Sequence, residues 1–351
     1  MKKLVYLLLG ALFLASCGSD DPISEPGAYD DGIFVVNEGP FGSGTGTLTF
    51  QGDDGVTTQQ VFEKENNNAI LGNIAQSMIY HNEKYYIVVN NANKIIVTDK
   101  NMKAIGEITG LFFPRYMVAN GNKAYVSQWG QNNKDGGIAV VDLNSLTVTK
   151  NIPTGNGPEY LLLDGNQLLV PNGGSYNTST FENQPDSTVS IIDLGSESVI
   201  KTISVKYNPN SVIKSKNGYI VSSAEKSFGE GNGNLYFVNL TNNSATIIEG
   251  TINESSKSYS KLKKVSDKEF LTVFGGYLVT MMTIDEVNGK VNSIRTFGSG
   301  YVADYNDKRN LIYVADAKDF NQAGEIRTYT KAGVEGKKFA AGIIPGGFCF
   351  R

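Results

Sequence analysis

The stretch that decides the fold is PRYMVANGNKAYVSQWGQNNKDGGIAVVDL, residues 114–143. It predicts four short strands, because Asn/Gly turn residues and a polar loop separate short apolar runs, at residues 116–119, 124–127, 138–142 and 146–149. Four antiparallel strands within roughly 40 residues make one blade of a β-propeller when the pattern recurs.

The second strand of this unit does recur along the chain. Seven copies are visible, at residues 33–36, 85–89, 124–126, 168–170, 219–221, 270–273 and 311–314. Their separation of about 40 to 50 residues lies in the range of propeller repeats. No segment shows a sustained apolar period of about 3.6 residues, so almost no helix is expected.

The first unit lacks an inner strand, because only a polar spacer precedes Ile33. The missing strand is available at the other end of the chain, in residues 344–350. Pairing of this strand with the first unit would close the ring and leave no free edge between the first and last blades. The sequence therefore predicts an all-β, seven-bladed β-propeller whose C-terminal strand completes the N-terminal blade.

The N-terminal residues have the features of an export signal. Lys2 and Lys3 precede an apolar run at residues 4–15, which is too short to span a bilayer and fits a secretory signal. The following Leu-Ala-Ser-Cys, ending at Cys17, resembles the lipobox that lipoprotein signal peptidase cuts. That resemblance implies lipidation of Cys17 and stable membrane anchoring. The alternative is an ordinary secretory signal with an incidental cysteine.

The residues after Cys17 form a short spacer that contains the acidic pair Asp20-Asp21. This pair resembles the signal that sends Bacteroidetes lipoproteins to the outer face of the outer membrane, although a merely acidic tether is the alternative. We therefore expect a lipoprotein signal peptide at residues 1–16, a lipidated flexible tether at 17–28 and the propeller at 29–351. The expected location is the outer membrane, lipid-anchored and exposed at the cell surface.

The charge and the reactive side chains exclude several classes of function. The net charge is −4 and no basic cluster is present, so nucleic acid is not an expected partner. With the single histidine His81, no Ser-His-Asp relay and no multi-histidine metal site can be built. We expect no catalytic residue, no metal and no cofactor. Carboxylates such as Glu38 and Glu159 keep a lyase or calcium-dependent lactonase open as an alternative.

The long loops are expected on one face of the ring, because the connections between second and third strands and the crossovers emerge there. Long loops on a rigid scaffold usually carry binding function. Aromatic and amide residues in these loops and at the inner-strand starts are the candidate ligand-binding residues: Asn37, Glu38, Phe41, Asn90, Asn91, Arg115, Tyr116, Gln128, Trp129, Glu159, Tyr160, Asn172, Tyr176, Asn210, Phe228, Tyr301 and Phe320. The alternative is that the aromatics plug the channel and the amides cap turns.

Residues 34–39, 41–46, 75–78 and 87–91 carry a resemblance to YncE-like propeller lipoproteins of gut Bacteroidetes. The resemblance extends more loosely over the mature chain. It implies a non-catalytic surface protein that captures cobalamin or a related corrinoid and hands it to a TonB-dependent outer-membrane transporter. A corrinoid is wide, roughly flat and rimmed with amides, so a ring of amide and aromatic groups suits it. A glycan or a peptide would suit the same surface.

Overall fold

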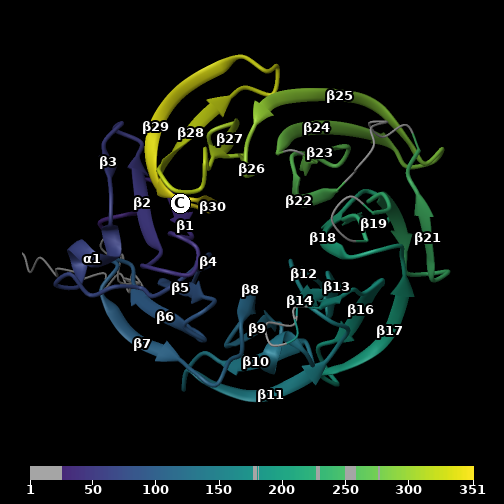
Figure 1. Cartoon of the computed structure of the whole chain (residues 1–351), viewed down its shortest axis with the longest axis horizontal. Coiled ribbons are helices and arrows are strands. Elements are labelled where there is room, and N and C mark those ends of the chain that lie inside the picture. The colour runs from purple at the N-terminus through teal and green to yellow at the C-terminus, as the bar shows by residue number, and fades with distance from the viewer. Residues whose placement is uncertain (1–25, 177–179, 181, 227–229, 250–257, 276) are drawn as a thin grey trace, which may run out of the picture.

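The computed structural model describes residues 26–176, 180, 182–226, 230–249, 258–275 and 277–351. These residues form seven four-stranded antiparallel sheets arranged in a ring around a central channel (Figure 1). Each sheet runs from the channel to the rim of the ring, so it is one blade. The predicted seven-bladed propeller is confirmed.

Every blade has four strands that follow one another from the channel to the rim. In this order, the first three blades consist of β30 (Pro345–Phe350), β1 (Gly32–Asn37), β2 (Thr47–Gly52) and β3 (Thr57–Thr58); β4 (Ala75–His81), β5 (Lys84–Val89), β6 (Lys94–Asp99) and β7 (Ala104–Ile108); and β8 (Pro114–Asn120), β9 (Lys123–Gln128), β10 (Gly137–Asp142) and β11 (Thr147–Pro153).

The other four blades follow the same order. They consist of β12 (Leu162–Asp164), β13 (Gln167–Asn172), β16 (Thr188–Asp193) and β17 (Ser198–Ser204); β18 (Pro209–Lys214), β19 (Tyr219–Ser223), β20 (Leu235–Asn239) and β21 (Ser244–Ile247); β22 (Tyr259–Lys264), β23 (Glu269–Phe274), β24 (Leu278–Asp285) and β25 (Lys290–Ser299); and β26 (Val302–Asn306), β27 (Leu311–Asp316), β28 (Ala323–Tyr329) and β29 (Glu335–Ile343).

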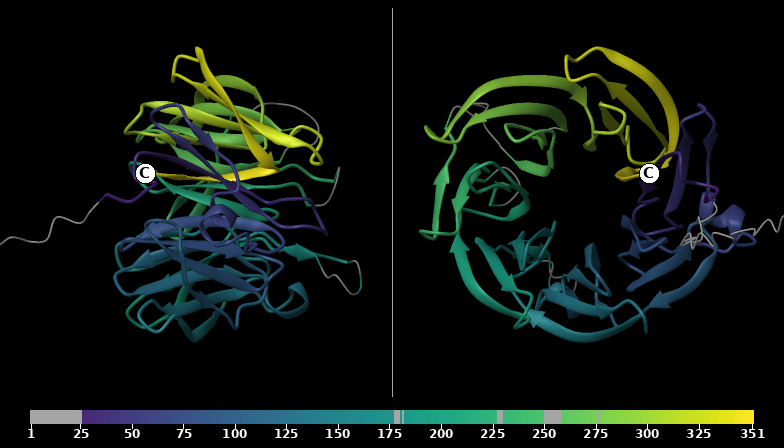
Figure 2. Two further views of the ribbon diagram at one scale, coloured as in Figure 1. Left: turned by 90° about the vertical axis from the view of Figure 1, so that its left-hand side faces the viewer. Right: turned by 180° about the vertical axis from the view of Figure 1, so that it is seen from behind.

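Little else is regular in the described part of the chain. The short strands β14 (Ser175–Tyr176) and β15 (Asn183–Gln184) pair as a hairpin that extends from one face of the ring (Figure 2). One short helix, α1 (Val61–Glu65), and one turn of 3₁₀-helix at Gln131–Asn133 complete the elements. None of the described helices is long and apolar enough to cross a membrane.

The C-terminal strand closes the ring as the sequence predicts. β30 pairs antiparallel with β1, so that Phe350 lies opposite Ile33 and Phe348 lies opposite Val35. The first blade is therefore built from both ends of the chain. This pairing uses the inner edge of β1, which would otherwise present free backbone N–H and C=O groups.

The core lies between adjacent blades. Because a blade packs against a neighbour on each side, its middle strands are apolar on both faces, and every residue of β1 is buried. Separate apolar clusters fill the spaces between successive blades. This rigid ring positions the inner strands, whose N-terminal ends meet at one mouth of the channel.

The two faces of the ring differ in loop length. Tight turns such as residues 82–83 and 121–122 join the first and second strands on one face. Loops of very different size, including residues 38–46, 129–136 and 173–187, join the second and third strands on the other face. We call this second face the wide-loop face. It is the face predicted to carry function.

Candidate functional site

The inner strands deliver polar side chains to the channel on the wide-loop face. In most blades the residue that follows the first position of the inner segment is large and polar: Gln76, Arg115, Glu159, Asn210 and Tyr301. Proline starts several of these segments, because the first position of an inner strand tolerates the missing N–H. The repeat therefore places a large polar side chain at the same inner position of five blades, around one end of the channel.

A pocket of about 390 Å³ lies at this end of the channel. We call it the mouth pocket, and its lining residues are Glu38, Phe41, Ile74, Gln76, Arg115, Tyr116, Lys261, Tyr301, Phe320 and Ile344. Six predicted residues meet there, because Glu38, Phe41, Arg115, Tyr116, Tyr301 and Phe320 all line it.

An ion pair forms one wall of the mouth pocket. Arg115 donates from Nε to Glu159 Oε1 at 3.1 Å and from Nη2 to Glu159 Oε2 at 3.2 Å. Its remaining nitrogen, Nη1, donates to Gln76 Oε1. The guanidinium also lies 4.6 Å from the centre of the Trp129 ring, whose Nε1 donates to Glu159 Oε1 at 3.1 Å. The Arg115–Glu159 ion pair and the contact of the guanidinium with the Trp129 ring together hold this wall in place.

Glu38, Tyr301 and Lys261 form a second charged group in the mouth pocket. The hydroxyl of Tyr301 donates to Glu38 Oε1 at 3.1 Å. The ammonium of Lys261 lies 3.3 Å from the centre of the Tyr301 ring and donates to the Tyr301 carbonyl at 3.0 Å. Lys261 has a positive φ of 54° at a register shift of β22, and this unusual backbone turns its side chain toward the channel.

The titration of these groups follows from their loss of water. Burial raises the pKa of Glu38, although Lys261 and Arg115 oppose the shift. Burial lowers the pKa of Lys261 to about 8, despite the opposing charge of Glu38. Burial also disfavours the charge of Arg115, but the Glu159 carboxylate more than compensates and the Arg115 pKa stays above its ordinary value.

A pair of tyrosines separates the mouth pocket from the channel below it. The rings of Tyr116 and Tyr160 stack with centroids 3.8 Å apart and planes 21° from parallel. Behind them, Lys263 pairs with Asp304 at 2.9 Å. The two tyrosines therefore plug the channel, as the alternative interpretation of the aromatics expects, while Tyr116 also lines the mouth pocket.

The rim of the mouth pocket is aromatic. Phe41, in the loop between β1 and β2, is 85% exposed. Tyr301, Tyr277 and Phe320 form a cluster with ring centroids 5.5 to 6.0 Å apart. Large apolar side chains in water are unfavourable unless a partner covers them, so this rim offers contact area to a ligand.

A second hollow of about 480 Å³ adjoins the Arg115–Glu159 wall. We call it the side pocket; four predicted residues, Trp129, Glu159, Tyr176 and Asn210, line it. Its other lining residues are mostly polar and include Asn183, Gln184, Asn208 and Lys226. Arg115 lines the mouth pocket and its partner Glu159 lines the side pocket, so a wide ligand could contact both.

Four of the predicted amides serve the scaffold instead of a pocket. Asn37, Asn90, Gln128 and Asn172 are buried at the ends of second strands. Asn37 Nδ2 donates to Thr49 Oγ1 at 3.0 Å, and Asn172 Nδ2 donates to Ser190 Oγ at 3.0 Å. The side chains of these four residues lie inside the blades and line neither the mouth pocket nor the side pocket.

The remaining predicted residues have other placements. Asn91 is exposed on the wide-loop face and donates to Asn73 Oδ1 at 2.7 Å, outside both pockets. Tyr160 lines the channel below the mouth pocket. Phe228 and the proposed lipidation site Cys17 lie outside the described residues.

The sequence interpretation missed several residues of the site. Gln76 had a usable signal, because it occupies the same repeat position as Arg115 and Glu159. No sequence signal pointed to Lys261, because its place in the mouth pocket depends on the register shift in β22. Within the described ranges, no group of three or more His, Cys, Asp and Glu side chains is arranged to hold a metal ion.

Comparisons with solved structures agree with the fold. The periplasmic gluconolactonase of Pseudomonas aeruginosa has a TM-score of 0.62 at 10% identity, over 90% of this chain and 97% of that chain. A quinoprotein alcohol dehydrogenase-like protein of Bacteroides thetaiotaomicron has a TM-score of 0.62 at 12% identity, over 92% and 78%. Hydrazine synthase of Kuenenia stuttgartiensis has a TM-score of 0.57 at 15% identity, over 92% and 99%.

These identities show a common propeller architecture and nothing finer. Among curated proteins, no sequence matches this chain. A family model does match: residues 31–262 fit the family described as "Domain of unknown function (DUF5074)", which spans the first blades of the ring and more than half of the sequence. The chain is a seven-bladed β-propeller that belongs to the DUF5074 family.

Proposed function

We propose that this protein is a non-catalytic capture protein whose wide-loop face binds a corrinoid, with cobalamin as the first candidate. The observation that carries the proposal is the exposed aromatic rim around the mouth pocket, above all Phe41 at 85% exposure. Aromatic residues supply much of the energy of binding sites, because they cover a large area at a small entropic cost.

The charges of the mouth pocket support an uncharged, amide-rich ligand. Arg115 is neutralised by Glu159, and Lys261 faces Glu38 through Tyr301. These groups still present N–H donors and carboxylate acceptors toward the pocket. A corrinoid rim carries amides, which both donate and accept hydrogen bonds, so it suits such a wall without needing a net charge.

The shape of the face supports a wide ligand. The mouth pocket and the side pocket, of about 390 and 480 Å³, meet at the Arg115–Glu159 wall. A flat macrocycle could cover the mouth pocket while an attached group enters the side pocket. A rigid ring of blades holds both pockets open before the ligand arrives, which lowers the entropic cost of binding.

The proposed setting is the bacterial cell surface. The sequence ending at Cys17 supports a lipid anchor, and a surface protein that captures corrinoids would deliver them to a TonB-dependent outer-membrane transporter. Incorporation of labelled palmitate, together with digestion by protease added to intact cells, tests this placement. Palmitate that still labels a Cys17→Ser variant, or full protection from protease, would contradict it.

The function is tested by titrating the purified protein with cyanocobalamin in a calorimeter and by gel filtration of the mixture. We expect tight binding, with the ligand's colour eluting with the protein. Phe41→Ala should weaken binding by about tenfold or more, as expected for an exposed aromatic anchor. Val287→Ala is the matched control, because Val287 is 88% exposed in the loop between β24 and β25 on the opposite face.

Absence of cyanocobalamin binding would reject the corrinoid proposal. Binding to a glycan array that Phe41→Ala weakens, without cyanocobalamin binding, would assign the same face to carbohydrate. Equal effects of Phe41→Ala and Val287→Ala would remove the mouth pocket from the proposal and place the ligand elsewhere.

A second candidate function rests on Glu38 and Lys261. One pocket holds a carboxyl group with a raised pKa and an amine with a lowered pKa, a combination common at catalytic sites. Hydrolysis or elimination on a lactone or sugar acid would use such a pair. Turnover of gluconolactone above the uncatalysed rate, abolished by Glu38→Gln, would favour this function; no turnover would leave capture as the role of the pocket.

A further inference from the structure

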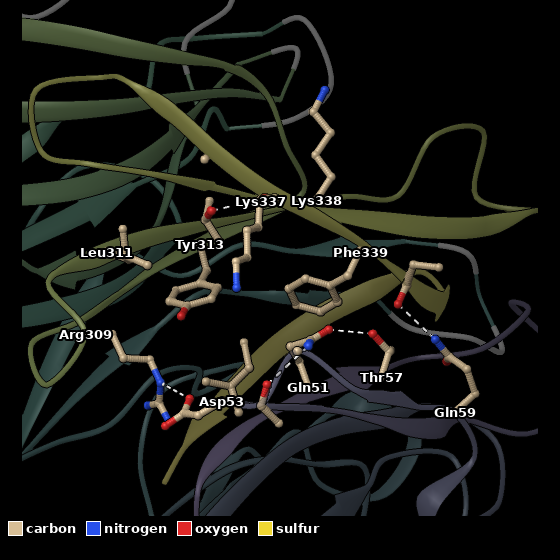
Figure 3. Close-up of a pocket in the computed structure, with 16 residues that line it drawn as sticks. Gln51, Asp53, Thr57, Gln59, Arg309, Leu311, Tyr313, Lys337, Lys338 and Phe339 are labelled. Carbon is tan, nitrogen blue, oxygen red and sulfur yellow. Dashed lines mark hydrogen bonds and ion pairs between the residues drawn. The ribbon is translucent and has the colours of Figure 1, made fainter.

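A large hollow lies away from the channel, between the last blade and the first. We call it the outer groove (Figure 3). Its volume is about 980 Å³, and its walls include Ile33, Gln51, Leu311, Tyr313, Lys337 and Phe339. None of its lining residues belongs to the mouth pocket or the side pocket.

The groove exists because two neighbouring outer strands differ in length. β29 of the last blade has nine residues, whereas β3 of the first blade has two. After β3 the chain turns to the other side of the first blade, where Val61 and Phe62 of α1 are buried in the cluster shared with the second blade. The side facing the last blade is left without a cover of equal length.

The floor of the groove is apolar. Ile33 and Tyr313 belong to the buried cluster between these blades, and Leu311 and Phe339 pack against it while half-buried. Figure 3 shows the Tyr313 and Phe339 rings lining the same hollow. An apolar lining with a few polar groups is characteristic of sites for small molecules.

One positive charge in the groove has no counter-charge among the described residues. Lys337 extends from β29 between Tyr313 and Phe339 (Figure 3), and none of the ion pairs in the described part of the chain includes it. Arg309, at the end of the groove, is already neutralised by Asp53, with its Nε donating at 2.7 Å. Lys338 also contributes to the lining, but its side chain extends in the opposite direction to that of Lys337 and pairs with Glu335 at 2.7 Å.

We propose that the outer groove binds a small amphipathic carboxylate, such as a medium-chain fatty acid. The apolar chain would lie over Leu311, Tyr313 and Phe339, and the carboxylate would pair with Lys337. The unpaired ammonium beside the half-buried side chains of Leu311 and Phe339 is the complement of this ligand class. The inference does not depend on what the mouth pocket binds.

The test compares laurate with dodecanol, which share a chain and differ in charge, by calorimetry on the purified protein below the micellar concentration. Laurate should bind, and dodecanol should bind at least about tenfold more weakly, the effect of one charge-assisted hydrogen bond. Lys337→Gln should weaken the binding of laurate by a similar factor and leave the binding of dodecanol unchanged. Lys338→Gln, one residue along β29, is the matched control and should bind laurate as the wild type does.

Several outcomes would overturn the proposal. These are an absence of laurate binding, equal affinity for laurate and dodecanol, and equal weakening by Lys337→Gln and Lys338→Gln. Competition between laurate and cyanocobalamin would move laurate to the wide-loop face and equally reject the outer groove. Simultaneous binding of both ligands, with unchanged circular dichroism of the Lys337→Gln variant, would support it.

Discussion

Arg115 and Glu159 join two neighbouring blades through a double hydrogen bond, with Nε–Oε1 and Nη2–Oε2 distances of 3.1 and 3.2 Å. Both side chains are largely buried, at 18% and 12% exposure. Such a pair costs desolvation energy that an apolar pair would not, so an apolar pair of similar volume could stabilise the channel mouth equally well.

The Arg115–Glu159 pair gives the first prediction. Glu159→Gln should lower the free energy of unfolding by about 3 kcal/mol, because Arg115 stays buried without its main counter-charge. Replacing both, by Arg115→Met with Glu159→Leu, should cost less than the single change. Urea denaturation of the three proteins measures the difference. A double variant that loses as much stability as Glu159→Gln, or more, would contradict a coupled pair.

Lys261 gives the second prediction, which concerns pH. Its pKa of about 8 in the folded protein lies below its ordinary value of 10.5. Between these two values the unfolded chain holds a proton that the folded protein has lost, so stability rises with pH there. One proton can contribute at most about 1.4 kcal/mol per pH unit to the free energy of unfolding.

The Lys261 effect is measured against the Lys261→Met variant, which cancels the other groups that titrate in the same window. We expect the wild type to gain stability relative to the variant as the pH rises from about 8 to 10. Urea denaturation at a series of pH values follows the difference. A difference that stays constant with pH, or that shifts in favour of the variant, would mean that Lys261 is well solvated.

The architecture could be predicted because the same local chemistry occurs in every blade. Turn residues such as Asn120 and Gly121 and the apolar strands around them determine a blade without help from distant residues. The unpaired first unit and the strand-like C-terminus then leave closure by β30 as the consistent solution. Because each repeat determines the structure of its own blade, the fold could be predicted from the sequence.

The site could be predicted only in part, because two kinds of tertiary information are absent from the repeat. Asn37 ends β1 and Phe41 lies four residues later in the following loop, yet Asn37 is fully buried and Phe41 is exposed. The hydrogen bonds of Asn37 to Thr47 and Thr49 become visible only once β2 is in register with β1. Lys261 reaches the mouth pocket because its backbone has a positive φ, and no residue pattern in the sequence predicts that conformation.

The third prediction compares the buried Asn90 with the exposed Asn91. Asn90 is 5% exposed and donates to the Pro114 carbonyl of the next blade at 3.0 Å, whereas the adjacent Asn91 is exposed. Asn90→Ala should lower the free energy of unfolding by about 1–3 kcal/mol, because a buried carbonyl loses its donor. Asn91→Ala should change it by less than about 0.5 kcal/mol. Urea denaturation compares them, and equal losses would show that Asn90 does not join the blades.

Trp129 gives the last prediction, because it is the only tryptophan in the sequence and stands at the Arg115–Glu159 wall. A corrinoid absorbs visible and near-ultraviolet light, so a bound one should quench the Trp129 emission by energy transfer. Laurate in the outer groove should leave that emission unchanged, since the groove does not include Trp129. Steady-state fluorescence, corrected for the ligand's own absorption, measures both. Trp129→Phe provides the background, and free tryptophan the inner-filter control. Quenching by cyanocobalamin no greater than that of free tryptophan would place the ligand away from this wall, even where calorimetry reports binding.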